Sequence, residues 1–184
     1  MGTRPTTARV REAVMNILGP RLPGCRWLDL CSGSGIMGCE ALQRGASKVV
    51  AVESHASTAR TCEQNLKQTR DGCNTNASIV VIRRDLIRWL SQGWNQAPFD
   101  LVYFDPPYQL AIHDQTLSLL RQGGWLNTSS WVICEHASDH DLKAESTWTV
   151  VDQRRYGLTS LLFLTPLTHS LHDGIDSKRP QTNL

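Results

Sequence analysis

Short apolar segments alternate with helical segments along the chain, and this alternation limits the possible folds more than any other feature of the 184 residues. The apolar segments predict strands because they are short and rich in β-branched or aromatic residues. They are residues 26–30, 48–52, 79–82, 99–104 and 131–134. Helical patterns lie between them, at residues 36–44, 57–67, 86–90 and 114–120. Apolar strands separated by helices are typical of a parallel sheet covered on both faces, so the sequence predicts an α/β fold.

Both ends of the chain add elements to this pattern. Residues 6–18 predict a helix before the first strand, and Thr6 or Thr7 can cap it. Residues 148–151 and 160–164 predict two strands with only a turn between them. Two strands joined so directly form a hairpin, so one strand must be antiparallel in an otherwise parallel sheet.

The chain has about the length of one domain, and we expect that domain to span residues 1–164. Within it, residues 1–20 form an N-terminal arm and helix. From residue 165 onward the sequence is polar, so residues 165–184 predict a disordered tail.

Composition excludes several classes of protein. The apolar content of 40% and charged content of 20% are ordinary for a globular protein. No apolar run approaches the length of a membrane span, and the N-terminus lacks the apolar core of a secretory signal. The six cysteines form no C-x-x-C pair and no zinc-like spacing, so we expect reduced, mostly buried thiols and no metal. We expect a cytoplasmic monomer. Four histidines show no partner pattern and are expected on the surface or in loops: His55, His113, His136 and His140.

A glycine-rich loop follows the first predicted strand, where ligands of open parallel sheets bind. Gly33 and Gly35 allow its backbone to turn tightly and to approach a ligand. Glu53 ends the second strand, and a carboxylate there can accept hydrogen bonds from both hydroxyls of a ribose. These residues predict a nucleotide-containing ligand at this edge of the sheet.

The same loop has the glycine spacing of a dinucleotide site, so NAD is an alternative ligand. Asp29 counts against NAD, because a carboxylate at the strand end repels a pyrophosphate and attracts a sulfonium or amino group. The alternative is a glycine turn that binds nothing. We expect the loop to bind the cofactor through Asp29, Cys31, Ser32, Gly33, Ser34 and Gly35.

Asp85 follows the third strand, and Leu86 begins the short helix after it. In this architecture an adenine would lie close by, and the Asp85 carboxylate can accept a hydrogen bond from the adenine amine. Asp85 also suits the N-cap of the helix at 86–90, and both roles can hold. We expect Asp85 and Leu86 on the adenine side of the cofactor.

The fourth strand ends in Asp105-Pro106-Pro107-Tyr108, the predicted reaction centre. The prolines stop strand pairing and fix the backbone, although a rigid turn is the alternative explanation. The nitrogen of a base amine is conjugated with its ring and is a poor nucleophile. Asp105 Oδ and the Pro106 carbonyl can accept its hydrogens and localise the lone pair, while Tyr108 stacks on the base. The methyl group then moves in line from sulfur to nitrogen.

Four segments together resemble the RsmD-type small-subunit ribosomal RNA (guanine-N2)-methyltransferases, over roughly residues 4–164. The Asp-Pro-Pro-Tyr block is common to many amino-methyltransferases, whereas the opening and the helix end are much more specific. The segments are Arg4-Pro5-Thr6-Thr7-x-x-Val10-Arg11-Glu12, Leu28-Asp29-Leu30-Cys31-Ser32-Gly33-Ser34-Gly35, Gly38-x-Glu40-Ala41-Leu42-x-Arg44-Gly45-Ala46 and Asp105-Pro106-Pro107-Tyr108.

The resemblance implies the class I S-adenosylmethionine-dependent methyltransferase fold, which is Rossmann-like. Its sheet is mostly parallel and seven-stranded, with a C-terminal antiparallel hairpin. The implied donor is S-adenosylmethionine, the product S-adenosylhomocysteine, and the acceptor guanine N2 in 16S rRNA. The resemblance also makes Arg4, Thr6 and Arg11 candidate contacts to the cofactor or RNA, with a solvated helix face as the alternative for Arg11.

The net charge of +2 does not predict strong non-specific binding to nucleic acid. We therefore expect the RNA to be recognised as a folded, protein-bound structure within a small-subunit assembly particle. Members of the family usually carry a basic extension before the Arg-Pro-Thr segment. Because only three residues precede Arg4 here, the expectation is either a truncated start or a smaller RNA-binding surface.

Three other functions compete with this interpretation. The first is methylation of another amine, such as adenine N6 in DNA or RNA or a protein glutamine. The second is an NAD-dependent oxidoreductase, which leaves the Asp-Pro-Pro-Tyr block unexplained. The third is an RNA-binding domain without catalytic activity, which transfer of labelled methyl groups would exclude.

Overall fold

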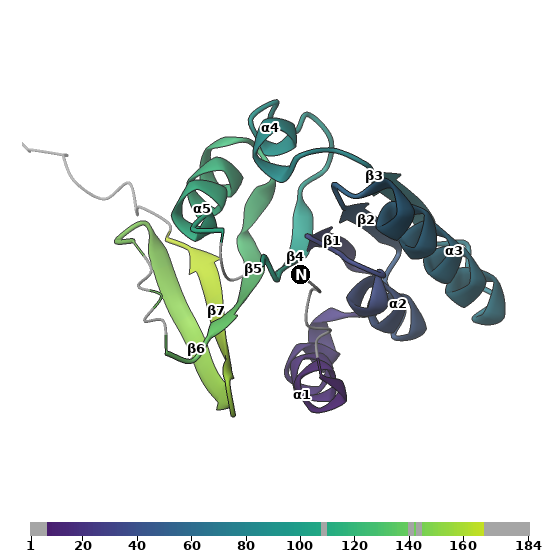
Figure 1. The fold of residues 1–184 in the computed structure, drawn as a ribbon, viewed down its shortest axis with the longest axis horizontal. Coiled ribbons are helices and arrows are strands. Elements are labelled where there is room, and N and C mark those ends of the chain that lie inside the picture. The colour runs from purple at the N-terminus through teal and green to yellow at the C-terminus, as the bar shows by residue number, and fades with distance from the viewer. Residues whose placement is uncertain (1–6, 108–109, 140–141, 143–144, 168–184) are drawn as a thin grey trace, which may run out of the picture.

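The computed structural model describes residues 7–107, 110–139, 142 and 145–167. Its centre is a seven-stranded sheet in the order β3-β2-β1-β4-β5-β7-β6 (Figure 1). The strands are β1 (Arg26–Leu30), β2 (Lys48–Val52), β3 (Ser78–Ile82), β4 (Phe99–Phe104), β5 (Leu126–Ala137), β6 (Trp148–Tyr156) and β7 (Thr159–Pro166). The helices are α1 (Ala8–Leu18), the 3-10 turn η1 (Gly19–Arg21), α2 (Ile36–Gln43), α3 (Ala56–Gly72), α4 (Leu86–Leu90) and α5 (His113–Gln122).

Strand pairing confirms the predicted mixed sheet. β1 pairs in parallel with β2 and β4, β2 with β3, and β4 with β5. β7 lies between β5 and β6 and is antiparallel to both. Because β1 lies between β2 and β4, the loops that follow these three strands emerge next to one another at the carboxyl edge of the sheet.

Helices cover both faces of the sheet (Figure 1). One apolar core joins the sheet to α1, α2 and α3, through residues such as Val14, Leu42 and Leu66. A second core joins the opposite face to α4 and α5, through residues such as Trp89 and Leu117. The central strands are therefore buried on both sides, as their continuous apolar sequences predict. None of the described helices is long and apolar enough to cross a membrane.

The capping residue of the first helix is Thr7. Its side-chain oxygen accepts a hydrogen bond from the backbone N–H of Val10, at 3.3 Å. A threonine hydroxyl in this position satisfies one of the amides that the first helical turn leaves unpaired. This choice between Thr6 and Thr7 fixes the start of α1 at Ala8, and the preceding residues 1–6 lie outside the described ones.

β5 and β6 are longer than their apolar segments predicted. The early part of β5 is polar, and the Ser130 hydroxyl donates to the Phe99 carbonyl at 2.6 Å beside an irregularity in the β4–β5 pairing. β6 is an edge strand with one face toward solvent, so charged residues such as Arg154 do not end it. β7 also continues through Pro166, which the sequence placed in the tail; residues 168–184 lie outside the described ones.

The expected surface position of the histidines is wrong for His136. Its side chain is 4% exposed in β5, because the strand extends past the apolar segment that marked it. His55 is exposed in front of α3, and His113 is half-buried at the start of α5. All six cysteines are free and four are buried, which agrees with the expected reduced thiols.

Candidate functional site

Four acidic residues lie at the carboxyl ends of four neighbouring strands. Asp29 lies within the end of β1, Glu53 follows β2, Asp85 comes after β3, and Asp105 follows β4. The strand order β3-β2-β1-β4 brings these ends to one edge of the sheet. Neighbouring strands lie about 5 Å apart, so side chains at adjacent ends can act on one ligand.

The loop between β1 and α2 has an unusual backbone. Cys31, Gly33 and Gly35 all have positive φ, at 60°, 54° and 78°. Left-handed backbone is unfavourable for a residue with a side chain, and such conformations concentrate at functional sites. At Gly35 an added Cβ would also lie 2.6 Å from Cys62 Sγ, so both conformation and packing require glycine there.

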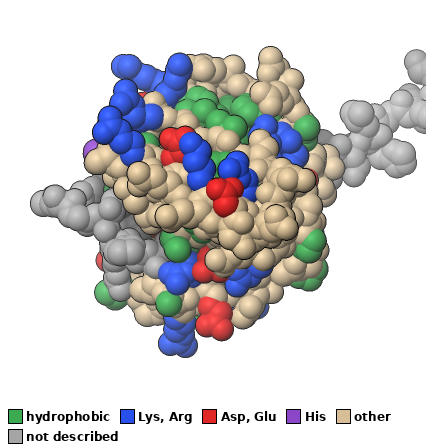
Figure 2. Space-filling model, turned by 90° about the vertical axis from the view of Figure 1, so that its right-hand side faces the viewer, with side chains coloured by type: hydrophobic (Ala, Val, Ile, Leu, Met, Phe, Trp, Pro, Cys, Tyr) green, Lys and Arg blue, Asp and Glu red, His purple; other side chains and the backbone are tan. Residues whose placement is uncertain are grey.

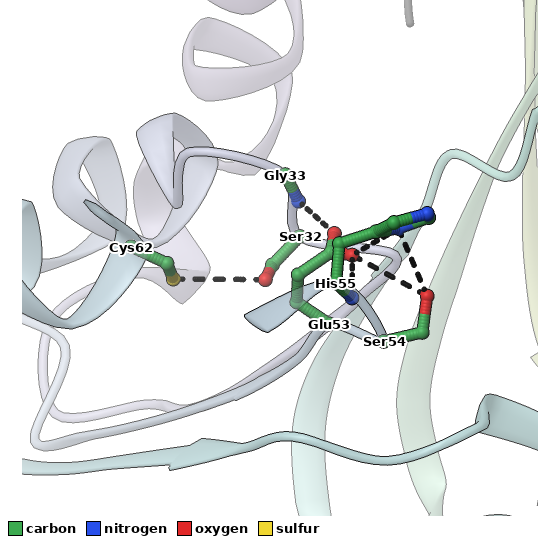
Figure 3. Close-up of polar contacts among 6 residues, drawn as sticks. All are labelled: Ser32, Gly33, Glu53, Ser54, His55 and Cys62. Carbon is green, nitrogen blue, oxygen red and sulfur yellow. Dashed lines mark hydrogen bonds and ion pairs between the residues drawn. The ribbon is translucent and has the colours of Figure 1, made fainter. Parts of the chain in front are cut away.

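Glu53 holds this loop against the start of α3 (Figure 3). One carboxylate oxygen accepts the backbone N–H of Gly33 at 3.1 Å, and the other accepts the N–H of His55 at 2.8 Å. The residue is 9% exposed. The Ser54 hydroxyl and His55 Nδ1 also lie 3.5 and 3.2 Å from Oε1, so the oxygen bonded to Gly33 has the clearer capacity for a ribose hydroxyl.

Asp29 is buried beneath the loop and is 2% exposed. Its carboxylate accepts the backbone N–H of Gly38 at 3.1 Å, which fixes the first turn of α2. Burial raises the pKa of Asp29 well above its usual range, the bond from Gly38 lowers it, and the charges of Asp105 and Glu53 raise it. Asp29 therefore shapes the loop from below, and it adds negative charge to the site only in its ionised form.

The charges of the four acidic residues affect the pKa of the Cys31 thiol. Burial raises its pKa to about 12, and four carboxylates contribute to the same shift. In decreasing order of effect they are Glu53, Asp105, Asp29 and Asp85. All four predicted acidic residues thus act on one point of the glycine loop. Such a concentration of negative charge favours a ligand that carries positive charge.

Asp85 caps α4, as one of its two predicted roles requires. Its Oδ1 atom accepts the backbone N–H of Arg88 at 2.9 Å. The side chain is exposed, while Leu86 beside it is buried in the core under α4. The cap leaves the second carboxylate oxygen available at the edge of the sheet.

The end of β4 lies directly beside the glycine-loop strand. The backbone N–H of Asp105 donates to the Leu30 carbonyl at 3.4 Å, so the two strand ends are joined where their loops begin. Asp105 is half-buried, Pro106 is buried and Pro107 is exposed. Tyr108 lies outside the described residues.

Arg11 forms an ion pair within the described part of the chain. Its Nε atom lies 3.1 Å from Glu40 Oε1, an ion pair that joins α1 to α2, and its side chain is 25% exposed. Glu40 also pairs with Arg44, the C-cap residue of α2. Arg11 of the first segment therefore contacts Glu40 of the Glu-Ala-Leu-x-Arg-Gly-Ala segment. Arg4 and Thr6 lie outside the described residues.

Some contacts of the site were not found from the sequence. The Ser32 hydroxyl lies 3.6 Å from Cys62 Sγ, and Ser54 and His55 surround the Glu53 carboxylate (Figure 3). The contact between Ser32 and Cys62 joins residues that are distant in sequence, and no spacing pattern indicates it. Ser54 and His55 could have been found from the sequence, because two polar residues directly before a helix are typical of its N-terminus.

A basic group lies on the side of the molecule that contains α3 and β3. Figure 2 shows Lys and Arg side chains gathered at the upper left of this face. The segment from the end of β3 into α4 carries three exposed arginines, none of which forms an ion pair with a described residue. They are Arg83, Arg84 and Arg88.

The chain has relatives that match most of its length. The family model described as conserved hypothetical protein 95 matches residues 1–165. The ribosomal RNA small subunit methyltransferase D of Haemophilus influenzae is 33% identical over 159 residues, covering 86% of this chain and 81% of that protein. The Escherichia coli K12 protein of the same name is 32% identical over 141 residues, covering 77% and 68%. The solved structure of Escherichia coli yhhF matches with a TM-score of 0.78 at 25% identity, over 91% of this chain and 90% of that one.

Proposed function

This chain belongs to the RsmD-type family, and from that membership we propose that it transfers a methyl group from S-adenosylmethionine to N2 of a guanine in 16S ribosomal RNA. In coarser terms it is an S-adenosylmethionine-dependent ribosomal RNA methyltransferase. One observation carries the choice of reaction centre. The segment Asp105-Pro106-Pro107 begins beside the start of the glycine loop, because the backbone N–H of Asp105 donates to the carbonyl of Leu30, the last residue of β1.

The described residues suit S-adenosylmethionine, which supplies an electrophilic methyl group on a positively charged sulfur. Their negative charges act together at the Cys31 loop, and that field favours a cation over a pyrophosphate. We assign Glu53 to the ribose hydroxyls and Asp85, with Leu86, to the adenine side. The proposed cofactor residues are Asp29, Cys31, Ser32, Gly33, Ser34, Gly35, Glu53, Asp85, Leu86 and Asp105.

The proposed role of the Asp105 segment is to prepare the base amine. The Asp105 carboxylate and the Pro106 carbonyl accept hydrogen bonds from the two N–H groups of the amine, which favours a pyramidal nitrogen with a localised lone pair. Pro107 fixes the backbone that presents both acceptors. Tyr108 is proposed to stack on the guanine. With S-adenosylmethionine bound, these residues would hold the nitrogen toward its methyl group, so that the S–C bond breaks as the N–C bond forms, S-adenosylhomocysteine leaves and the nitrogen loses one proton to water. Positioning and electrostatics would supply the rate enhancement.

The RNA partner is proposed to be 16S rRNA within a small-subunit assembly particle, bound by one copy of this chain. The names of two relatives refer to the ribosomal RNA small subunit, which supports this partner. The exposed arginines near β3 and α4 support contact with phosphate groups. Arg4, Thr6 and Arg11 remain proposed RNA or cofactor contacts, with Arg11 also holding α1 to α2.

Two matched variants test the assignment with labelled S-adenosylmethionine and small-subunit particles. Asp105→Ala is expected to lower kcat about a hundredfold and to weaken S-adenosylhomocysteine binding much less, because nine other proposed residues also contact the cofactor. Glu53→Gln is expected to weaken S-adenosylhomocysteine binding about tenfold, since a charge-assisted bond is lost. Calorimetric binding and methyl incorporation are the two readouts. Methylation that survives Asp105→Ala would exclude this residue from the reaction centre.

A further inference from the structure

A hollow of ≈ 470 Å³ opens at the end of the sheet formed by β5, β6 and β7, away from the glycine loop. Its volume is in the range of sites that hold a small molecule or one nucleotide-sized group. It is lined by His136, Ser138, Asp139, Gln153, Arg154, Arg155 and Ser160. None of these residues belongs to the site described above.

Three of the lining residues form a row across the sheet. His136 of β5 pairs with Ser160 of β7, and Ser160 pairs with Arg155 of β6. Residues that are paired across antiparallel strands point to the same face of the sheet, with their Cβ atoms about 5 Å apart. Strand pairing, rather than a mobile loop, therefore sets the positions of the imidazole, the hydroxyl and the guanidinium.

The His136 ring is buried with one nitrogen unused. Its Nδ1 atom lies 3.0 Å from the Ala137 carbonyl, which can only accept, so Nδ1 carries the proton. In the neutral ring Nε2 is then an acceptor. It is buried, and no described residue supplies it with a hydrogen-bond partner. Six buried side-chain atoms of the described residues lack a hydrogen-bond partner, and His136 Nε2 is the one whose residue also lines the hollow.

The two arginines of the hollow differ. Arg154 is held by Asp152, at 2.9 Å. Arg155 is exposed, donates to the Gly157 carbonyl at 3.4 Å, and forms no ion pair with a described residue. Its guanidinium has further donors in the planar arrangement that suits phosphate oxygens. Asp139 lines the same hollow, so the ligand is not selected by net charge alone.

The hollow lies on the same edge of the sheet as the proposed reaction centre. β4 and β5 are parallel neighbours, and Phe104 pairs with Cys134. Asp105 follows the first of these residues, and His136 lies two positions after the second. A polynucleotide strand bound at Asp105 would need only the width of a few strands, each about 5 Å, to reach His136.

We propose that this hollow binds one ribose-phosphate unit of the RNA beside the methylated nucleotide. Arg155 binds the phosphate, and His136 Nε2 accepts a hydrogen bond from the ribose 2′-hydroxyl. A 2′-hydroxyl is the donor that RNA has and DNA lacks, so this contact selects RNA. The proposal rests on the proposed function, because it takes RNA as the substrate.

Equilibrium binding of the full chain to a short single-stranded RNA and to DNA of the same base sequence tests the contact without methyl transfer. Wild type is expected to prefer RNA about fivefold, the value of one ordinary hydrogen bond. His136→Asn keeps a donor near Nδ1 and loses the Nε2 acceptor, so this preference is expected to disappear. His136→Gln can place an acceptor near Nε2 and is expected to retain it.

Arg155→Gln is expected to weaken RNA and DNA binding alike, about tenfold, and to reduce the salt dependence by about one phosphate contact. Arg70→Gln removes the same charge at the far end of α3 and is the control. The proposal is overturned if His136→Asn keeps the RNA preference, or if Arg155→Gln binds like Arg70→Gln. Because Arg155 is exposed, its variant remains informative even where His136→Asn does not fold.

Failure of the proposed function looks different. A wild-type chain that transfers no methyl group to small-subunit particles contradicts the methyltransferase assignment, whatever the oligonucleotides show. A chain that methylates particles normally but shows no RNA preference contradicts only the proposal for the hollow.

Discussion

Gly35 combines two constraints that a substitution can separate. Its φ of 78° disfavours any side chain, and an added Cβ would lie 2.6 Å from Cys62 Sγ. Gly33 has a φ of 54°, and no atom of the described residues lies within 4 Å of an added Cβ. Gly33→Ala should therefore lower the free energy of unfolding by about 1–2 kcal/mol for the backbone alone. Gly35→Ala should cost about 1–3 kcal/mol more, because of overpacking.

Urea denaturation of both variants measures this difference. Replacing Cys62 by alanine in the Gly35→Ala background should recover part of the additional loss, because it removes the Sγ atom. Equal free energies of unfolding for Gly33→Ala and Gly35→Ala would mean that the contact with Cys62 is unimportant.

Asp29 predicts a pH dependence of stability with a definite sign. Burial, together with the charges of Asp105 and Glu53, raises its pKa in the folded protein. The folded state then binds the proton more tightly than the unfolded state. This contribution to stability is present below the carboxyl's ordinary pKa and is lost as the pH rises through the raised value.

Asp29→Asn keeps an oxygen for the N–H of Gly38 but does not ionise. Its stability relative to wild type should therefore increase as the pH rises from acid to neutral. Denaturant titrations at a series of pH values give the comparison. A constant difference between the two proteins across the series would show that Asp29 does not titrate abnormally.

At the scale of elements, strand ends could be predicted well where apolar residues stop at a glycine, proline or carboxylate. β1, β2 and β4 begin and end where their sequences predict. β5 could not be bounded in this way, because its polar start is held by pairing with β4 and by the Ser130 hydroxyl. The full length of edge strand β6 could not be predicted either, because one of its faces lies toward solvent and lacks the apolar residues that mark a buried strand.

The packing of α1 on α2 is a further testable element-scale feature. Arg11 and Glu40 form an ion pair at 3.1 Å with side chains 25% and 20% exposed. A double-mutant cycle with Arg11→Ala and Glu40→Ala should give a coupling free energy of about 0.5–1 kcal/mol, reduced by salt. Arg44→Ala is the control, because it removes the other ion pair of Glu40 and leaves the pair between Arg11 and Glu40 in place.

The same variants bear on the proposed RNA contact. If Arg11 mainly holds the two helices, Arg11→Ala and Glu40→Ala should have similar effects on RNA binding. No coupling in stability, together with weaker RNA binding only for Arg11→Ala, would assign Arg11 to the RNA instead.

For the whole molecule, the sequence predicted which residues gather at the site better than it predicted the contacts between distant segments. Asp29 lies at the end of β1, and Glu53, Asp85 and Asp105 follow the next strands. A parallel α/β sheet largely determines the order of these strands, so the convergence of the four residues could be expected. Contacts that depend on strand pairing between distant segments could not be expected from the sequence. The row formed by His136, Ser160 and Arg155 depends on the register of an antiparallel pair and leaves no pattern within any one segment.

Identification of the modified nucleoside tests the proposed activity most directly. The full chain is incubated with labelled S-adenosylmethionine and small-subunit particles that lack the modification, and the 16S rRNA is then digested and analysed by mass spectrometry. We expect the label in N2-methylguanosine, at one position, and its loss with Asp105→Ala. Label in N6-methyladenosine or in protein, or no label at all, would contradict the assignment.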